Sequence, residues 1–271
     1  MIIGIFVGIT SGLLGVGGGF FMVPFQFFLL SSTGINPDLA LRISIGTSLA
    51  IIIPTGLSGV YTHYHELKQI LIPGVFIGVW GMIGGIFGGA TSAYIPANIL
   101  ETMLGIFLIL IAIYMLINKN SESRKDNIKL NLWLGVFLGL IIGFLSGLLG
   151  LGGGIFLIPL LIFLLDFSII EAIAISSIFI SLSSIGGTVS YIITGLGINP
   201  FPYSIGYVSL INFGMIAIFS IPFAFIGAKL AYKLSERKLK SIFAILMILI
   251  GIKILGIDIF SYFFKLLISY F

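Results

Sequence analysis

The sequence contains no cysteine and few charged residues. Of its 271 residues, 59% are hydrophobic and 8% are charged, and the mean hydropathy is +1.26. The absence of cysteine excludes disulfides, thiolate metal sites and cysteine nucleophiles. A soluble domain carries about 25% charged residues, so this chain has too few to cover a water-facing surface. A soluble globular enzyme is therefore excluded. We expect an all-α integral membrane protein with the lipid bilayer as its partner, and no nucleic acid.

Long apolar runs predict membrane helices, because inside a bilayer every backbone N–H and C=O must be satisfied within its own segment. The runs cover residues 2–30, 38–61, 70–92, 97–118, 131–165, 168–194, 203–231 and 238–257, with an apolar tail at 259–271. One hydrophilic segment, 119–130, interrupts them near the middle of the chain. The sequence thus predicts a first membrane repeat (1–118), a charged cytoplasmic linker (119–130) and a second membrane repeat (131–271).

The two halves share an unusual glycine-rich sequence. GITSGLLGVGGGFFMVP, from Gly8 to Pro24, matches GFLSGLLGLGGGIFLIP, from Gly143 to Pro159, at one constant offset of 135 residues. Further along, Thr47-Ser48 aligns with Ser176-Ser177, and 88–100 aligns more loosely with 227–239. A match of this length indicates an internal duplication.

The glycine cluster predicts a break in the first run. Its 29 residues would form a straight helix of about 43 Å, longer than the ~30 Å hydrocarbon core. Glycine disfavours helix and reaches backbone angles that other residues avoid, so we expect the break at 15–19 and its equivalent at 150–154. Unpaired N–H groups at the start of the second half-helix, with the positive end of its dipole, would attract an anion. Spaced glycines such as Gly8 and Gly12 instead favour close helix packing.

The basic residues distinguish two topologies by the positive-inside rule. If all eight runs cross the membrane, the thirteen Lys and Arg residues divide 7 to 6 between the two sides. If runs 2–30 and 131–165 are instead hairpins that return to the side they entered, the division is 10 to 3. We therefore favour the hairpins over tilted spans. Each half then has a hairpin and three crossings, so the halves form an inverted-topology repeat, as in many secondary transporters.

The repeated G-x-x-S-G-x-x-G-x-G-G-G…P sequence resembles the sulfite exporter TauE/SafE family of membrane permeases, as does the run from Ala40 to Ser48. The resemblance covers essentially the whole chain. It implies transport of small anions, typically sulfite or organosulfonates such as sulfoacetate, and it does not fix the substrate. In its second half the chain has Ser176-Ser177 in place of Thr-Ser.

A set of glycines, hydroxyl residues and one cation is expected to hold the anion. Intramembrane Arg42 contributes a positive charge, although Asp38, four residues earlier, provides an ordinary interfacial partner. The hydroxyl groups either donate to the anion or bond to carbonyl groups of their own helices. The expected site residues are Gly15, Gly17, Gly18, Gly19, Phe20, Gly150, Gly152, Gly153, Gly154, Ile155, Thr47, Ser48, Ser176, Ser177, Ser11, Ser146 and Arg42.

Other polar residues lie near the ends of the runs. His63, His65 and Glu66 are interpreted as a solvated turn, and Glu101 is the candidate for proton coupling. Gln26 is expected to hydrogen-bond across the first hairpin. No metal or cofactor is predicted.

These observations favour a multi-pass carrier in the plasma membrane that exports anions by alternating access, with a homodimer as an open possibility. An anion channel is the first alternative. An intramembrane serine protease using Ser11 or Ser146 with His63 is the second, but the Gly-x-Ser-Gly context of such enzymes is absent.

Overall fold

The computed structural model describes residues 2–66, 71–92, 132–165, 167–198 and 203–235, with isolated helical positions between 106 and 117 and between 238 and 252. The described chain is mainly helical. Its elements are α1 (Ile2–Leu14), α2 (Gly19–Ser32), α3 (Pro37–Glu66), α4 (Leu71–Thr91), α6 (Leu132–Leu149), α7 (Gly154–Leu164), α8 (Ile169–Thr194), β1 (Ser204–Ile205), β2 (Val208–Ser209) and α9 (Leu210–Lys233).

Five of these helices are long and apolar enough to cross a membrane, namely α3, α4, α6, α8 and α9. Helices α1, α2 and α7 are apolar but shorter. The sequence-based expectation of apolar helices long enough to cross a membrane is therefore confirmed for the five long helices. The linker 119–130 and the tail 259–271 lie outside the described residues, as do the expected runs 97–118 and 238–257 apart from the isolated helical positions.

The run 203–231 is not helical throughout, so the prediction was wrong for its first seven residues. Strands β1 and β2 pair antiparallel through a turn in which Gly206 has φ 55°. The N–H groups of this hairpin bond to neighbouring helices, with Tyr207 N donating to Tyr191 O (3.3 Å) and Ser209 N to Thr47 Oγ1 (3.0 Å). Ser209 then caps α9 by accepting from Asn212 N.

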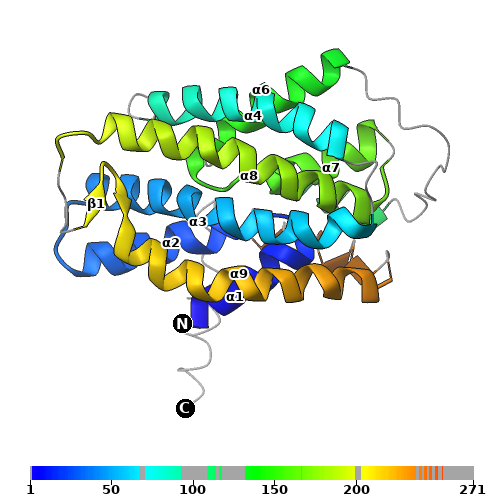
Figure 1. The fold of residues 1–271 in the computed structure, drawn as a ribbon, viewed down its shortest axis with the longest axis horizontal. Coiled ribbons are helices and arrows are strands. Elements are labelled where there is room, and N and C mark those ends of the chain that lie inside the picture. Colours follow the sequence, from blue (N-terminus) through cyan, green and yellow to red (C-terminus); the bar gives the residue numbers. More distant parts are fainter. Residues whose placement is uncertain are drawn as a thin grey trace. The chain divides into compact units, whose positions relative to one another are not determined.

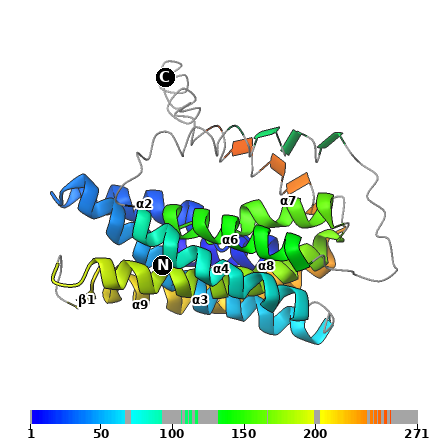
Figure 2. The same cartoon turned by 90° about the horizontal axis from the view of Figure 1, so that it is seen from above.

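The described helices of both sequence halves form one compact unit, Met1–Ala93 with Glu122–Leu234. Within it, α3 and α8 pack together at the centre, with α4 and α6 on the α8 side and α1 and α9 on the α3 side (Figure 1). The long helices run along a common direction in both views (Figure 2). A second unit, Tyr94–Ser121 with Ser235–Phe271, contains the isolated helical positions.

Glycine allows the backbones of the outer helices to approach closely. Helix α1 packs on α9, where a Cβ added at Gly8 would lie 2.5 Å from Ser220 O. Helix α6 packs on α4, where a Cβ added at Gly143 would lie 2.6 Å from Gly81 Cα. Any side chain at either position would separate the helices. Because Gly8 and Gly143 are 135 residues apart, matching glycines carry the same kind of contact in each half.

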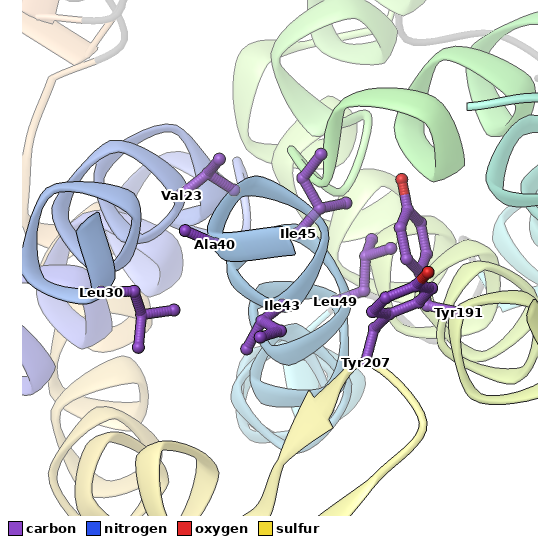
Figure 3. Packing of buried hydrophobic residues seen from close by; sticks show 8 residues of the cluster. All are labelled: Val23, Leu30, Ala40, Ile43, Ile45, Leu49, Tyr191 and Tyr207. Atoms are coloured by element: carbon purple, nitrogen blue, oxygen red, sulfur yellow. The ribbon is translucent and has the colours of Figure 1, made fainter. Parts of the chain in front are cut away.

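An apolar cluster holds α2, α3, α8 and the β-hairpin together (Figure 3). Leu49 on α3 is fully buried, and Tyr191 and Tyr207 meet nearby with ring centroids 6.3 Å apart in an edge-to-face arrangement. Such aromatic pairs contribute about 0.5–1.5 kcal/mol beyond their buried area. The cluster is made of Val23, Leu30, Ala40, Ile43, Ile45, Leu49, Tyr191 and Tyr207.

Candidate functional site

Two helix breaks interrupt the chain at the glycine clusters. Helix α1 ends at Leu14 and α2 begins at Gly19, while α6 ends at Leu149 and α7 begins at Gly154. Both breaks use three left-handed glycines in the same order. The φ angles are 64°, 86° and 71° at Gly15, Gly17 and Gly18, and 71°, 82° and 81° at Gly150, Gly152 and Gly153. Other residues rarely adopt these angles, which explains why glycine occupies the positions.

Each break leaves backbone N–H groups at the start of a helix without an intrahelical acceptor. In α2 the first bonds come from the N–H groups of Phe21 and Met22, both to Gly18 O. The N–H groups of Gly19 and Phe20 precede them, as those of Gly154 and Ile155 do in α7. Neither helix has a side-chain cap, and both breaks are buried. Together with the helix dipoles, these amides favour a negatively charged group.

The two breaks face each other. A Cβ added at Gly19 would overlap Gly150 O and lie 2.9 Å from Leu151 Cα. Reciprocally, a Cβ added at Gly154 would overlap Gly15 O. The start of each half-helix therefore abuts a carbonyl group of the opposite break. No residue larger than glycine fits at either start without moving the breaks apart.

Two serines connect the central helices to these carbonyl groups. Ser48 on α3 donates to Gly150 O (3.0 Å), and Ser176 on α8 donates to Gly15 O (2.7 Å). Each serine therefore bonds to the glycine break of the other sequence half, and both serine side chains are fully buried. We call these two bonds the reciprocal serine contacts. They determine where the carbonyl groups of the breaks point.

The reciprocal contacts pair the two halves one residue out of the register that the sequence alignment predicts. The structure matches Ser48 with Ser176, whereas the alignment matches it with Ser177. Ser177 instead donates to Ile173 O in its own helix (2.9 Å). Thr47 accepts from Ser209 N of the β-hairpin. Thus four of the six expected hydroxyl ligands have partners within the protein.

Ser146 differs from these four hydroxyl groups. It is fully buried on α6, and its Oγ has no hydrogen-bond partner. Its Cβ lies 3.2 Å from where a Cβ at Gly153 would be, so the hydroxyl group is next to the second break. The matching Ser11 is also buried. An unpaired buried hydroxyl group costs about 1–3 kcal/mol, which a hydrogen-bonding ligand would recover.

Charged side chains are excluded from the buried part of the site. Among the residues that the structure describes, no Asp, Glu, Lys or Arg side chain is buried. Arg42 is half-buried on α3, with its guanidinium carbon 5.8 Å from the centre of the Tyr207 ring. Asp38 is exposed on the same helix, and its pairing with Arg42 stays a prediction. Backbone dipoles and hydroxyl groups remain as the polar groups at the breaks.

Two of the other expectations were also wrong. His63 is not in a solvated turn, since it is 1% exposed and its Nδ1 lies 2.8 Å from Tyr232 Oη on α9. Gln26 is 1% exposed, but neither atom of its amide has a hydrogen-bond partner. The side chains of His65 and Glu66, and the whole of Glu101, lie outside the described residues. No hydrogen bond joins His63 to Ser11 or Ser146, as a serine protease would require.

Comparison with known proteins shows similarity over almost the whole chain. The family model described as "Sulfite exporter TauE/SafE" matches residues 1–254. A "Probable membrane transporter protein MJ0441" from Methanocaldococcus jannaschii is 34% identical over 253 residues, which cover 93% of this chain and 92% of that protein. The "Probable membrane transporter protein YunE" of Bacillus subtilis is 38% identical over 88 residues, 31% of this chain and 32% of that protein. No solved structure matches.

Proposed function

The chain belongs to the sulfite exporter TauE/SafE family and is a multi-pass membrane transporter, and we propose that it exports a small anion bound between its two glycine breaks. The proposed cargo is sulfite or an organosulfonate such as sulfoacetate, the proposed membrane is the plasma membrane, and the protein acts as a carrier, not as an enzyme. The observation that carries this proposal is the pair of buried helix starts, each with two N–H groups that lack an intrahelical acceptor.

The chemistry of the breaks suits an anion that exchanges readily. A buried Lys or Arg would hold an oxyanion tightly, whereas backbone N–H groups and hydroxyl groups provide a weaker and reversible shell. Ser146 Oγ, which has no partner, is available as a further donor. In this conformation the carbonyl groups of Gly15 and Gly150 lie against the opposite helix starts, so an entering anion must displace them.

The two breaks also support a mechanism of alternating access. We propose that residues 1–118 and 131–271 are inverted-topology repeats, with the breaks at the interface between them. The matching φ angles, the reciprocal serine contacts and the matched glycine contacts at Gly8 and Gly143 support this assignment. Movement of one repeat against the other would break the reciprocal contacts and expose the anion alternately to the two sides.

The membrane potential favours export. An interior-negative potential contributes about 2.3 kcal/mol per elementary charge per 100 mV, so a divalent anion is driven outward by about twice that without a coupled ion. Export by this mechanism needs only one chain. The homodimer stays a prediction.

Flux from proteoliposomes tests the proposal. Vesicles are loaded with sulfite, sulfoacetate, sulfate, thiosulfate or acetate, and choline is the cationic control. We expect saturable efflux of sulfite or sulfoacetate, accelerated by the same anion on the opposite side. Acceleration of that kind identifies a carrier, whereas anion flux without it indicates a channel. If folded and inserted protein transports none of these anions, the proposed cargo is refuted.

A test of the site itself requires substitutions that preserve the fold. Valine at Gly18 or Gly153 is a poor choice, because both residues have positive φ and the added Cβ would lie 2.5 Å from Val7 Cγ1 or 2.8 Å from Phe179 Cε1. Gly19 has no positive φ, so alanine there changes the gap between the breaks without straining φ. Gly214→Ala on α9 is the matched control, because nothing lies within 4 Å of its added Cβ.

A further inference from the structure

His63 is a titratable side chain buried at the end of a candidate membrane span. The span Asp38–His63 of α3 ends at this residue, and the imidazole is 1% exposed. Imidazole is the side chain whose ordinary pKa lies closest to physiological pH. Of the side chains that the structure both describes and buries, His63 is the only one of this kind. Ionisable groups at such positions are costly to keep without a function.

The imidazole is held on one side only. Its Nδ1 forms a hydrogen bond of 2.8 Å with Tyr232 Oη, and the two rings lie 5.4 Å apart between centroids. Its Nε2 is buried and has no hydrogen-bond partner. If Nδ1 carries the hydrogen and donates it to Tyr232, the lone pair of Nε2 is free to accept a proton. The bond to Tyr232 therefore orients the ring and leaves one nitrogen open.

His63 lies in an interface that contains several polar contacts beside the Tyr61–Phe225 ring pair. Between α3 and α9, Thr55 Oγ1 and Ser220 Oγ are 2.9 Å apart, and Ser58 donates to Ile221 O (2.9 Å). The His63–Tyr232 bond extends this row toward the end of α3. Hydrogen bonds of this type each contribute about 1 kcal/mol and can be exchanged, so the interface can slide or open at low cost.

The contact between α4 and α8 is different in kind. There Gly74 and Gly78 pack directly against the side chains of Ile178 and Leu182, with an added Cβ 2.6 Å from each side chain. A close-packed glycine interface has no exchangeable bonds and tolerates little displacement. Of the two interfaces, the α3–α9 contact is therefore the one that a proton can control.

Among the residues that the structure describes, few charged groups lie near this end of the interface. On α9, Lys229 and Lys233 are exposed, and Lys229 Nζ lies 4.2 Å from the centre of the Phe225 ring. At the start of α8, Glu171 is held in a capping box by Ser168. Tyr232 is the group in direct contact with the imidazole. A proton on Nε2 would thus introduce a positive charge that no described carboxylate neutralises.

We propose that His63 is a proton-binding site of this transporter and that its protonation loosens the contact between α3 and α9. A positive charge in a buried position is unfavourable, so the protonated ring moves toward water and pulls α3 away from α9. This inference rests on the proposed function, because alternating access assigns α3 and α9 to opposite repeats. It adds a proton as a second ligand, which makes transport dependent on pH.

Proton binding can be observed without any transported anion. The chain contains two histidines, so His65→Gln leaves His63 as the single imidazole. We expect the ¹⁵N spectrum of the labelled variant in lipid vesicles to change from neutral to charged imidazole as the pH is lowered from about 9 to about 3. Tyr232→Phe should shift the midpoint. An imidazole that stays neutral over the whole range would overturn the proposal and leave the anion site unaffected.

The effect on the interface is measured by distance. Since the chain has no cysteine, spin labels can be placed uniquely at Leu57→Cys on α3 and Ile226→Cys on α9, both of which are exposed. We expect the label distance to lengthen below the midpoint in the His65→Gln background and to stay constant when His63→Gln is added. Glutamine keeps a donor for Tyr232 but does not titrate. The same distance distribution at both pH values would overturn the proposal.

Flux then separates this inference from the proposed cargo. Sulfite flux limited by one titrating group changes by up to about tenfold per pH unit, and His63→Gln should remove this dependence. A pH profile unchanged by His63→Gln would overturn the coupling. If no sulfite moves at any pH while His63 titrates and the labels separate, the cargo is wrong and the proton site stands.

Discussion

Replacing Gly19 with alanine inserts one methyl group between the two glycine breaks. The methyl group would overlap Gly150 O and lie 2.9 Å from Leu151 Cα, and both of these are backbone atoms that cannot rotate away. Overpacking of this type costs about 1–3 kcal/mol. The better helix propensity of alanine offsets up to about 1 kcal/mol of that cost. We therefore expect the unfolding free energy to fall by about 0–3 kcal/mol.

The expected effect on transport has a different cause from the effect on stability. Separation of the breaks moves the N–H group of Gly19 away from an anion shared by both helix starts. A hydrogen bond to a charged group contributes about 1.5–3 kcal/mol, so its loss lowers anion affinity about ten- to a hundredfold. Gly154→Ala should act in the same way, because its methyl group would overlap Gly15 O.

Two assays on the same purified variants distinguish these effects. Thermal unfolding measures stability, and the dependence of sulfite efflux on concentration measures affinity. Gly214→Ala should leave the affinity unchanged, because its methyl group meets no atom within 4 Å. If Gly19→Ala transports sulfite with the affinity of the unmodified protein, an anion is not held between the breaks and the reasoning is refuted.

Three further sets of substitutions test other parts of the structure. Removing both hydroxyl groups of the reciprocal contacts, Ser48→Ala with Ser176→Ala, should lower the unfolding free energy by about 1–3 kcal/mol and accelerate hydrogen exchange at the breaks; unchanged exchange would contradict their role. Ser168→Ala should cost about 1 kcal/mol through loss of the α8 cap, without altering sulfite affinity. Arg42→Gln and Tyr207→Leu should show a coupling of about 0.5–1 kcal/mol in a double-mutant cycle, and additive effects would rule out their contact.

The helix breaks could be predicted from the sequence because two independent signals coincide there. A run of 29 apolar residues is too long for one straight span, and the glycines lie in its interior. The structure ends α1 at Leu14 and begins α2 at Gly19, within one residue of the predicted break at each end. The N–H groups of Gly19 and Phe20 then follow from helix geometry, without reference to any side chain.

The register of the serine pairs could not be predicted in the same way. Ser176 and Ser177 are chemically identical, and a shift of one residue turns a helical side chain by about 100°. Only the packing of α8 against the first break determines that Ser176, and not Ser177, reaches Gly15 O. The alignment of short hydroxyl pairs contains no information about that packing.

The remaining errors have a common cause. Polar residues at the end of an apolar run normally face water, so the sequence offered no signal that Tyr232, about 170 residues away, would bury His63. In the run 203–231 the apolar residues masked Gly206, whose positive φ begins a turn, and Ser209, which caps the following helix. Composition indicates well whether a segment lies in lipid or in water, but it does not identify the partners of individual side chains.

The packing of outer helices from opposite sequence halves has a consequence for synthesis of the chain. Helix α1 packs on α9, and α9 leaves the ribosome about 200 residues later, which takes roughly 10–40 s at ordinary translation rates. During that time the glycine face of α1, a helix too short to cross the membrane, has no partner from its own half to cover it. Helix α1 is thus synthesised well before its packing partner, and chains that stop before residue 210 are expected to be substrates for membrane quality control.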